Sequence, residues 1–384
     1  MEKLAIIGGS LAGLELARAL KDLDEHSDFE IHLFEEHPTI GLPLKCAEGF
    51  IAFHDIPGPD PNFILNEINS VVVRFIDEEL RILDSVHIPT EGKAWVINRP
   101  RNEQHLAAAC AKRGVIINLG HRVSIREISS SFDFIVDASG CPSEYARLSE
   151  RRTRPPSVGI GGTIRGDFTA FQHLMLIDFT PLLSRYFWIF PKTKALGNVG
   201  LGWHSSGSQP SKPKALLNRY LDTMLGHWHL EQWVAGCVGT ELSDTLYDPA
   251  QRVALLGDAA GLANPLVGEG MSNAILSART LASCLAADDV PSYPRLITNM
   301  IGSSYMSSLL GRHVLEKLGY EMFEKLFHSI RNPSLELLHM SSKRLLAKLA
   351  PHPFVLAEFA GSYLRYRIRK ALGKRPFAHW SLPS

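Results

Sequence analysis

A short turn near the start of the chain contains small residues at a spacing that suits phosphate binding. Gly8, Ser10 and Gly13 lie between the apolar run KLAII and the run LELARALKDL. A strand that ends in such a turn lets a pyrophosphate approach the backbone, and the N-terminus of the next helix holds its charge. Ser10 takes the place of the usual middle glycine and adds little bulk. We therefore predict that Gly8, Ser10 and Gly13 bind a dinucleotide.

An acidic residue follows in the second apolar run, FEIHLFEE, where a dinucleotide fold binds ribose. Glu35 ends the strand-like stretch IHLFE, and its carboxylate can accept hydrogen bonds from ribose hydroxyls. Glu36 is the competing residue. We favour Glu35 because of its place at the end of the strand.

A second motif lies in the stretch VALLGDAAGLANPLVGEGMSNAILS. Asp258 ends a buried strand, where a carboxylate can bind sugar or ribityl hydroxyls. Gly268 and Gly270 lead into a helix that begins near Met271, and the N-terminus of that helix stabilises an anion. Reduced flavin is such an anion, so the motif predicts further cofactor contacts. A plain helix cap would explain Gly270 but would leave Asp258 without a purpose.

Three aromatic residues alternate in the stretch YFWIFP. Tyr186, Trp188 and Phe190 share one face if this stretch is a strand. Such a face offers apolar area to a long hydrocarbon, worth about 25 cal/mol per Å² buried. Gly200 and Gly202 follow on the next strand, where glycine lets a ligand approach the backbone. The alternative is that the same face is ordinary core.

The elements that must position these residues form an α/β pattern. The first strand, helix and second strand make a βαβ unit, and FDFIVDASG returns as a buried strand. Short alternating runs such as SVVVRFI and LRILDSVHIP predict antiparallel strands. A helix is predicted at NEQHLAAACAKRG, and helix should dominate from about Lys214 to His229 and from Met271 onward.

We predict an α/β fold in which a discontinuous Rossmann-like domain contains an inserted antiparallel β-sheet domain. The cofactor domain comprises residues 1–60, 95–155 and 250–290, the substrate domain residues 61–94 and 156–249, and a helical C-terminal region residues 291–384. A chain of 384 residues is long enough for these units.

Composition narrows the class of partner. Lys plus Arg and Asp plus Glu are 40 each, which does not suggest a nucleic-acid partner. The five cysteines are odd in number and lack CxxC spacing, so we expect neither a disulfide framework nor a metal site. The strand begins within a few residues of Met1, which leaves no room for a secretion signal. We expect a cytoplasmic protein.

The chain shows no apolar run long enough to span a membrane. Its nearest candidate, Leu345 to Leu364, contains Lys348, Pro351 and Glu358. The basic stretch RYRIRKALGKR follows it, and we expect that such a tail can lie on an anionic membrane at the inner face of the cell. The alternative is a solvated helical face.

These motifs together resemble a known family. The first turn and the LLGDAAG…P..GEG stretch look like the two ends of the flavoprotein hydroxylase-type FAD fold. The stretch YxWxFP followed by GxG is similar to the signature of geranylgeranyl reductases. The stretch LPLKCAEGF resembles a segment of the archaeal members, which saturate digeranylgeranylglycerophospholipids.

The resemblance implies roles for further residues. The stretch IVDASG places Asp137 and Gly140 near the FAD pyrophosphate, and Arg99 stands where the family often has an arginine that contacts flavin. Cys46 and Glu48 belong to a loop over the flavin ring, where either could shape the site or relay a proton.

The implied reaction is the saturation of an isolated alkene by hydride from reduced FAD and a proton. Positive charge then builds at the more substituted carbon, and ring faces stabilise a cation by roughly 0.5 to 2 kcal/mol each. Tyr186 and Trp188 are therefore catalytic candidates beside Cys46 and Glu48.

Other functions share these motifs. An FAD monooxygenase or halogenase, a reductase of an isoprenoid quinone tail or chlorophyll side chain, and a non-catalytic lipid-binding flavoprotein are the alternatives. The sequence has one glycine-turn dinucleotide motif, so electrons come either from NAD(P)H bound without its own domain or from a ferredoxin or deazaflavin.

Overall fold

The computed structural model describes most of the chain up to His313. The described residues are 2–23, 29–53, 55–148, 157–182, 186–204, 210–313 and single positions at 315, 320, 321, 324, 356, 357, 360 and 364. The basic stretch RYRIRKALGKR, residues 365–375, which is proposed to contact a membrane, lies outside them.

A six-stranded sheet contains the first turn and the two strands that flank it. Its order is β15-β16-β9-β1-β2-β8, parallel except for β15. β1 lies at the centre, and the chain leaves it on one side to β2 and returns on the other at β9. The strands are β1 (Glu2–Ile7), β2 (Phe29–Glu35), β8 (Ile116–Leu119), β9 (Phe134–Asp137), β15 (Tyr247–Asp248) and β16 (Val253–Leu255).

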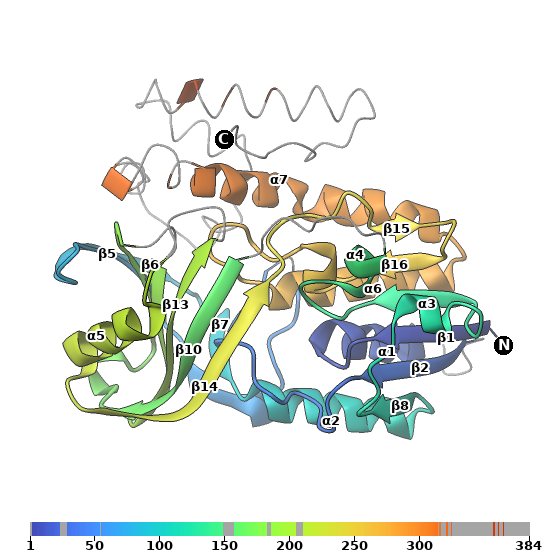
Figure 1. Ribbon diagram of the computed structural model, residues 1–384, viewed down its shortest axis with the longest axis horizontal. Helices are drawn as coiled ribbons and strands as arrows, with labels where there is room; N and C mark the ends of the chain where they lie inside the picture. Colours follow the sequence, from blue (N-terminus) through green and yellow to red (C-terminus); the bar gives the residue numbers. More distant parts are fainter. Residues whose placement is uncertain are drawn as a thin grey trace.

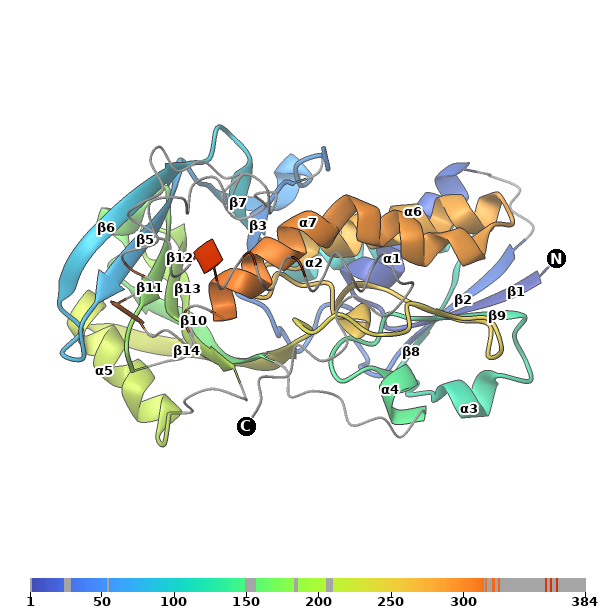
Figure 2. The ribbon, with the colours of Figure 1, turned by 90° about the horizontal axis from the view of Figure 1, so that it is seen from above.

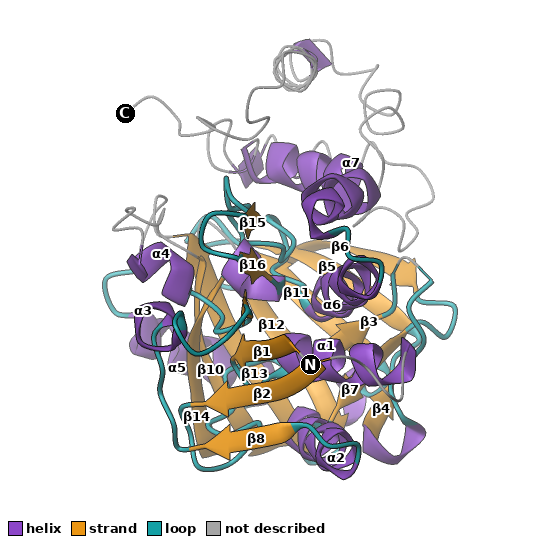
Figure 3. Ribbon diagram, turned by 90° about the vertical axis from the view of Figure 1, so that its right-hand side faces the viewer, coloured by secondary structure: helices purple, strands orange, loops and turns teal. Residues whose placement is uncertain are grey.

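Helices cover both faces of this sheet (Figure 3). On one face lie α1 (Leu11–Leu23), α2 (Arg99–Lys112) and α6 (Met271–Ala286), and on the other lie α3 (Ile125–Ile128) and α4 (Glu144–Leu148). α1 is buried along most of its length because it lies between the sheet and its two neighbouring helices. α7 (Tyr293–His313) crosses the top of the molecule and packs on α6 (Figures 1 and 2).

A seven-stranded sheet lies beside the first one (Figure 1). Its order is β14-β10-β13-β12-β11-β5-β6, antiparallel except between β11 and β5. The strands are β5 (Ser70–Ile76), β6 (Ile82–Pro89), β10 (Ser157–Gly166), β11 (Leu174–Phe179), β12 (Tyr186–Thr193), β13 (Leu196–His204) and β14 (Trp228–Val238).

Alternation along β12 gives the two faces of this sheet different neighbours. Phe187 and Ile189 pack toward α5 (Pro213–Leu225), where Phe187 stacks on Tyr220 with ring centroids 4.1 Å apart. Tyr186 and Trp188 point to the opposite face, which turns toward the six-stranded sheet. The aromatic wall therefore faces the region between the two sheets.

Small elements complete the fold. A three-stranded sheet, in the order β3-β7-β4, contacts β12 of the seven-stranded sheet and helix α6. These elements are β3 (Gly49–Ile51), β4 (Ile64–Glu67), β7 (Ala94–Ile97) and the 3-10 turns η1 (Pro61–Phe63), η2 (Thr169–Phe171), η3 (Gly257–Ala260) and η4 (Val290–Ser292).

The predicted α/β class, with a parallel and an antiparallel sheet, is confirmed. One element was predicted wrongly, because helix was expected as far as His229. α5 ends at Leu225, Gly226 turns the chain at a φ of 69°, and β14 begins at Trp228. Pairing with β10 outweighs the helical pattern there. The seven-stranded sheet comes from residues 70–89 and 157–238, while the exact domain limits stay a prediction.

Candidate active site

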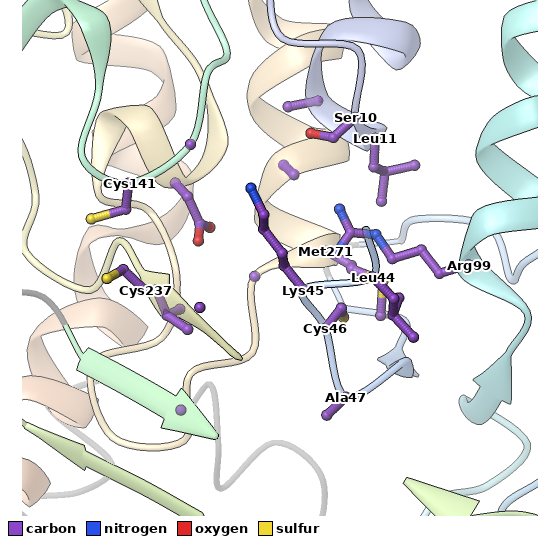
Figure 4. Close-up of a pocket in the computed structure, with 18 of the residues that line it drawn as sticks. Ser10, Leu11, Leu44, Lys45, Cys46, Ala47, Arg99, Cys141, Cys237 and Met271 are labelled. Carbon is purple, nitrogen blue, oxygen red and sulfur yellow. The ribbon is translucent and has the colours of Figure 1, made fainter. Parts of the chain in front are cut away.

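A cavity of about 510 Å³ lies between the carboxyl edge of the parallel sheet and the aromatic face of the other sheet. Its walls come from the turns after β1 and β9, the loop before β3, strand β12 and the start of α6 (Figure 4). The crevice outside the carboxyl ends of parallel strands, where the strand order reverses, is the usual ligand site of such sheets. Here that reversal lies between β1 and β9.

The first turn has a backbone that tolerates only glycine at one position. Gly8 has a φ of 111°, and a Cβ there would lie 2.3 Å from the carbonyl oxygen of Ala138 on the neighbouring strand turn. A Cβ on Gly13 would lie 2.2 Å from the Gly8 oxygen, so Gly13 lets α1 pack against the turn. Gly8 and Ser10 line the cavity, whereas Gly13 does not.

The two acidic candidates at the end of β2 both line the cavity. Glu35 accepts hydrogen bonds from the backbone nitrogens of Gly9 and His37, each at 2.9 Å. Glu36 instead faces His37 and Arg122, at 3.7 and 3.5 Å. Glu35 is thus held against the glycine turn, and its binding of a ribose stays a prediction.

Asp137 and Gly140 have different positions in the turn after β9. Asp137 is fully buried and does not line the cavity; its carboxylate accepts from the backbone nitrogens of Ser139 at 3.0 Å and Tyr145 at 2.7 Å. Burial raises the pKa of Asp137. Gly140 lines the cavity. Asp137 therefore stabilises the backbone of the turn without lining the cavity, and a contact with a cofactor would be indirect.

The second motif meets the first across the cavity. Asp258, Gly268, Gly270 and Met271 all line it. The Asp258 carboxylate accepts from the Gly239 nitrogen at 3.1 Å, and burial raises its pKa. A Cβ on Gly270 would lie 3.1 Å from that carboxylate, so glycine leaves room for it at the start of α6.

Glu269, just before α6, has a raised pKa in the folded protein. Burial, with a smaller effect from Asp258, raises the pKa of Glu269 to about 7. The native state therefore binds more protons than the unfolded state between the ordinary glutamate pKa and about pH 7. We expect the free energy of unfolding to fall as pH rises through this window.

The variant Glu269→Gln tests this effect. Between about pH 5 and pH 8, the free energy of unfolding should fall less in this variant than in the parent chain, because glutamine does not titrate. Urea unfolding at several pH values measures the difference. Parallel curves for the two proteins would contradict the assignment.

Arg99 begins α2 and lines the cavity. Its Nε donates to Glu103 at 2.8 Å, and the same Glu103 oxygen accepts from the backbone nitrogen of Leu11 at 2.9 Å. Burial lowers the pKa of Arg99, but the charge of Glu103 and the neighbouring Cys46 raise it by more. Glu103 thus ties α2 to the N-terminus of α1, a link that the sequence did not predict.

The loop before β3 brings Cys46 and Glu48 to the cavity. The Cys46 sulfur accepts from the Glu48 nitrogen at 3.2 Å and lies beside the Arg99 guanidinium. Glu48 has a φ of 66°, and its buried carboxylate is paired with the buried ammonium of Lys192 on β12. Nothing in the local sequence signalled Lys192 as a partner.

Lys45, in the same loop, extends into the cavity on the side of Ser10 (Figure 4). The acidic residues Glu35 and Asp258 line the same cavity. A lysine here suits an anionic ligand. The sequence motif in this loop indicates Cys46 and Glu48 and does not single out Lys45.

Tyr186, Trp188 and Phe190 all line the cavity from β12. The rings of Tyr186 and Trp188 are edge to face, with centroids 6.5 Å apart. Phe190 packs against the backbone of Gly49, since a Cβ there would lie 2.9 Å from its ring. The wall is therefore both a lining of the cavity and part of the core that joins the sheets.

The group beside the Gly200 backbone differs from the predicted one, which was a ligand. Gly200 does not line the cavity, because the indole of Trp188 fills the space beside it; Gly202 does line it. A Cβ on Gly200 would lie 2.2 Å from that indole and 2.5 Å from the Ile160 oxygen. Gly161 of β10, which pairs with Gly200, also leaves space for the Trp188 indole. These two glycines seat the tryptophan.

We expect Gly200→Ala to destabilise the protein by about 1–3 kcal/mol, because the new methyl group meets backbone as well as ring. Thermal or urea unfolding measures the loss. Gly236→Ala provides a control, since Gly236 has no positive φ and a Cβ there would meet only Lys45, at an ordinary contact distance of 3.5 Å. Equal losses in the two variants would show that seating Trp188 is not the reason for the glycine.

The described residues contain no cluster of His, Cys, Asp or Glu that could hold a metal ion. None of their helices has the length and apolar content needed to cross a membrane.

Comparisons with known proteins agree with this geometry. The model of the geranylgeranyl reductase catalytic domain matches residues 180–240, which contain the aromatic wall. A digeranylgeranylglycerophospholipid reductase of Methanothrix thermoacetophila is 24% identical over 391 residues, covering 90% of this chain and 94% of the relative.

Solved structures share the fold. A geranylgeranyl bacteriochlorophyll reductase-like protein from Thermoplasma acidophilum aligns with a TM-score of 0.75 at 21% identity, covering 94% of this chain and 99% of the other. CtdE, solved with FAD and a substrate, aligns with a TM-score of 0.55 at 14% identity, covering 86% and 90%. The fold resembles that of FAD-dependent hydroxylases, and the chain is similar to geranylgeranyl reductases over residues 180–240 and, distantly, over most of its length.

Proposed function

We propose that this chain is an FAD-dependent reductase that saturates isolated double bonds of geranylgeranyl chains, most specifically those of membrane lipid precursors. The observation that carries the proposal is that one cavity is lined by both cofactor motifs, by the aromatic wall and by the Cys46 loop. The distant relatives named for digeranylgeranylglycerophospholipid support the lipid class.

The residues present suit FAD. Gly8 and Ser10 line the cavity beside the N-terminus of α1, where a pyrophosphate would bind, and the Glu35 carboxylate, held against the turn by the Gly9 nitrogen, would accept hydrogen bonds from ribose hydroxyls. Asp258 offers a carboxylate to ribityl hydroxyls, and the start of α6 offers positive charge to a reduced ring. Bound and reduced FAD would supply the hydride. The external donor of those electrons is NAD(P)H, ferredoxin or deazaflavin.

The chain itself must supply the proton and stabilise the charge that forms. Glu48 is paired with Lys192 as a carboxylate, so we favour the Cys46 thiol as the proton donor. The thiolate left on Cys46 would be stabilised by the Arg99 guanidinium beside it. Tyr186 and Trp188 present their rings to the same cavity, where they can stabilise the developing cation.

The test uses the purified protein with its bound flavin. It is reduced by dithionite without oxygen and mixed with a geranylgeranylated glycerophospholipid, while the flavin spectrum and the lipid mass are followed. Reoxidation coupled to gains of two hydrogens supports the proposal. Bound flavin with an unchanged lipid mass contradicts it and favours a hydroxylase, a quinone-tail or chlorophyll reductase, or a lipid carrier.

A further inference from the structure

Asn198 lies in the middle of β13 with its side chain fully buried. An amide in such a place must find partners for its oxygen and its nitrogen, or it costs free energy. Its Oδ1 accepts from Trp188 Nε1 at 2.9 Å, and its Nδ2 donates to the Cys46 carbonyl oxygen at 3.1 Å. One side chain thus contacts both the aromatic wall and the Cys46 loop.

The two partners of Asn198 come from different parts of the fold. Trp188 belongs to β12 of the seven-stranded sheet, and Cys46 to the loop that follows β2 of the parallel sheet. Both line the cavity, whereas Asn198 does not. Asn198 can therefore influence a ligand in the cavity only through these neighbours.

We propose that Asn198 is a positioning residue that keeps the Cys46 thiol and the Trp188 indole in one fixed arrangement across the cavity. The consequence for catalysis rests on the proposed function. In that function, Asn198 would fix the proton donor, Cys46, and the cation-stabilising ring of Trp188 relative to each other. The hydrogen bonds themselves do not depend on that function.

A second contact holds the same loop independently. The Glu48 carboxylate is paired with Lys192 of β12, whose ammonium also lies 3.3 Å from Thr163 Oγ1. The loop should therefore stay on the sheet when Asn198 is changed. What changes is the exact placement of Cys46 and of the indole, which makes a specific test possible.

Two variants separate the two hydrogen bonds. Asn198→Asp is nearly isosteric and keeps an acceptor for the Trp188 N–H, but it replaces the donor to Cys46 by an oxygen. Asn198→Ala removes both bonds. Cys46→Ser, Trp188→Phe and the parent chain complete the set.

The first readout needs neither lipid nor turnover. Iodoacetamide labelling of the purified full chain at one pH, followed by peptide mass analysis, gives the rate for each cysteine. Cys237 is exposed and serves as the internal control in the same sample. We expect the rate of Cys46 relative to Cys237 to change by about fivefold or more in both Asn198 variants, because the loop backbone loses its donor.

The second readout is the tryptophan fluorescence assigned to Trp188 by comparison with Trp188→Phe. It should change in Asn198→Ala and stay close to the parent spectrum in Asn198→Asp. Unchanged relative labelling of Cys46 in both variants, with a normal unfolding midpoint, would overturn the proposal. If Asn198→Ala does not fold, Asn198→Asp alone decides between these outcomes.

The catalytic consequence is measured separately. If the parent chain reduces the lipid, Asn198→Asp should lower kcat by about tenfold and change KM little, since substrate contacts remain. A parent chain without lipid reduction would contradict the proposed function but leave the labelling test valid. A parent chain that is active, with Asn198 variants equal to it in labelling and kcat, would overturn only the role of Asn198.

Discussion

Gly8→Ala is expected to yield a protein that purifies with almost no flavin and unfolds more readily. A non-glycine residue at a φ of 111° is strained, at a cost of about 1–3 kcal/mol. The new methyl group would also lie 2.3 Å from the Ala138 oxygen, and such overpacking costs about 1–3 kcal/mol more. Moving the turn away from β9 closes the edge at which the phosphates are proposed to bind.

The matched control is Gly120→Ala. Gly120 also has a positive φ, of 67°, but nothing lies within 4 Å of a Cβ there. It should lose some stability by the same backbone strain and keep its flavin. Flavin content is read from the visible spectrum after precipitation, and stability from urea unfolding. Normal flavin content in Gly8→Ala would contradict the proposed place of the phosphates.

The first turn could be predicted because its determinants are local in the sequence. Gly8, Ser10 and Gly13 lie within one strand–turn–helix unit, and Glu35 ends the next strand. Periodicity and turn chemistry over a short window are enough to place such residues. The start of α6 at Met271 was predicted for the same reason.

Residues that depend on pairing between distant strands could not be predicted in this way. Gly161 makes room for Trp188 only because β10 pairs with β13 in a register that places it opposite Gly200. Asn198 reads as an ordinary polar residue until Cys46 approaches it from the other sheet. A single sequence contains no local signal for a register or for an approach of this kind.

The role of Gly200 shows how a correct motif can carry an incomplete explanation. Its spacing from the aromatic residues suggested close approach by a ligand, and the backbone is indeed closely approached. The approaching group is the indole of Trp188, from the same sheet. Gly200 of the glycine signature and Trp188 of the aromatic signature are therefore one feature, since Gly200 leaves the space in which the tryptophan ring lies.

Trp188→Leu is expected to lower the rate of alkene reduction by at least about tenfold while flavin stays bound. The lost cation–π attraction is worth roughly 0.5–2 kcal/mol, which alone is a factor of about 2 to 30 in rate. Leucine also leaves the groove between Gly161 and Gly200 unfilled and removes the partner of Asn198. The other wall residues would then lose their fixed placement against the substrate.

Two further variants separate these causes. Trp188→Phe keeps a ring face but loses the N–H bond to Asn198, so its rate should lie between those of the parent and the leucine variant.

Trp203→Leu changes a tryptophan of β13 that packs with the cluster around α5, on the other side of the sheet. It should leave the rate of reduction near that of the parent because it does not reach the cavity. Single-turnover reoxidation of reduced flavin, with lipid mass as the product assay, measures all three. A parent-like rate in Trp188→Leu would show that the wall binds the chain without stabilising charge.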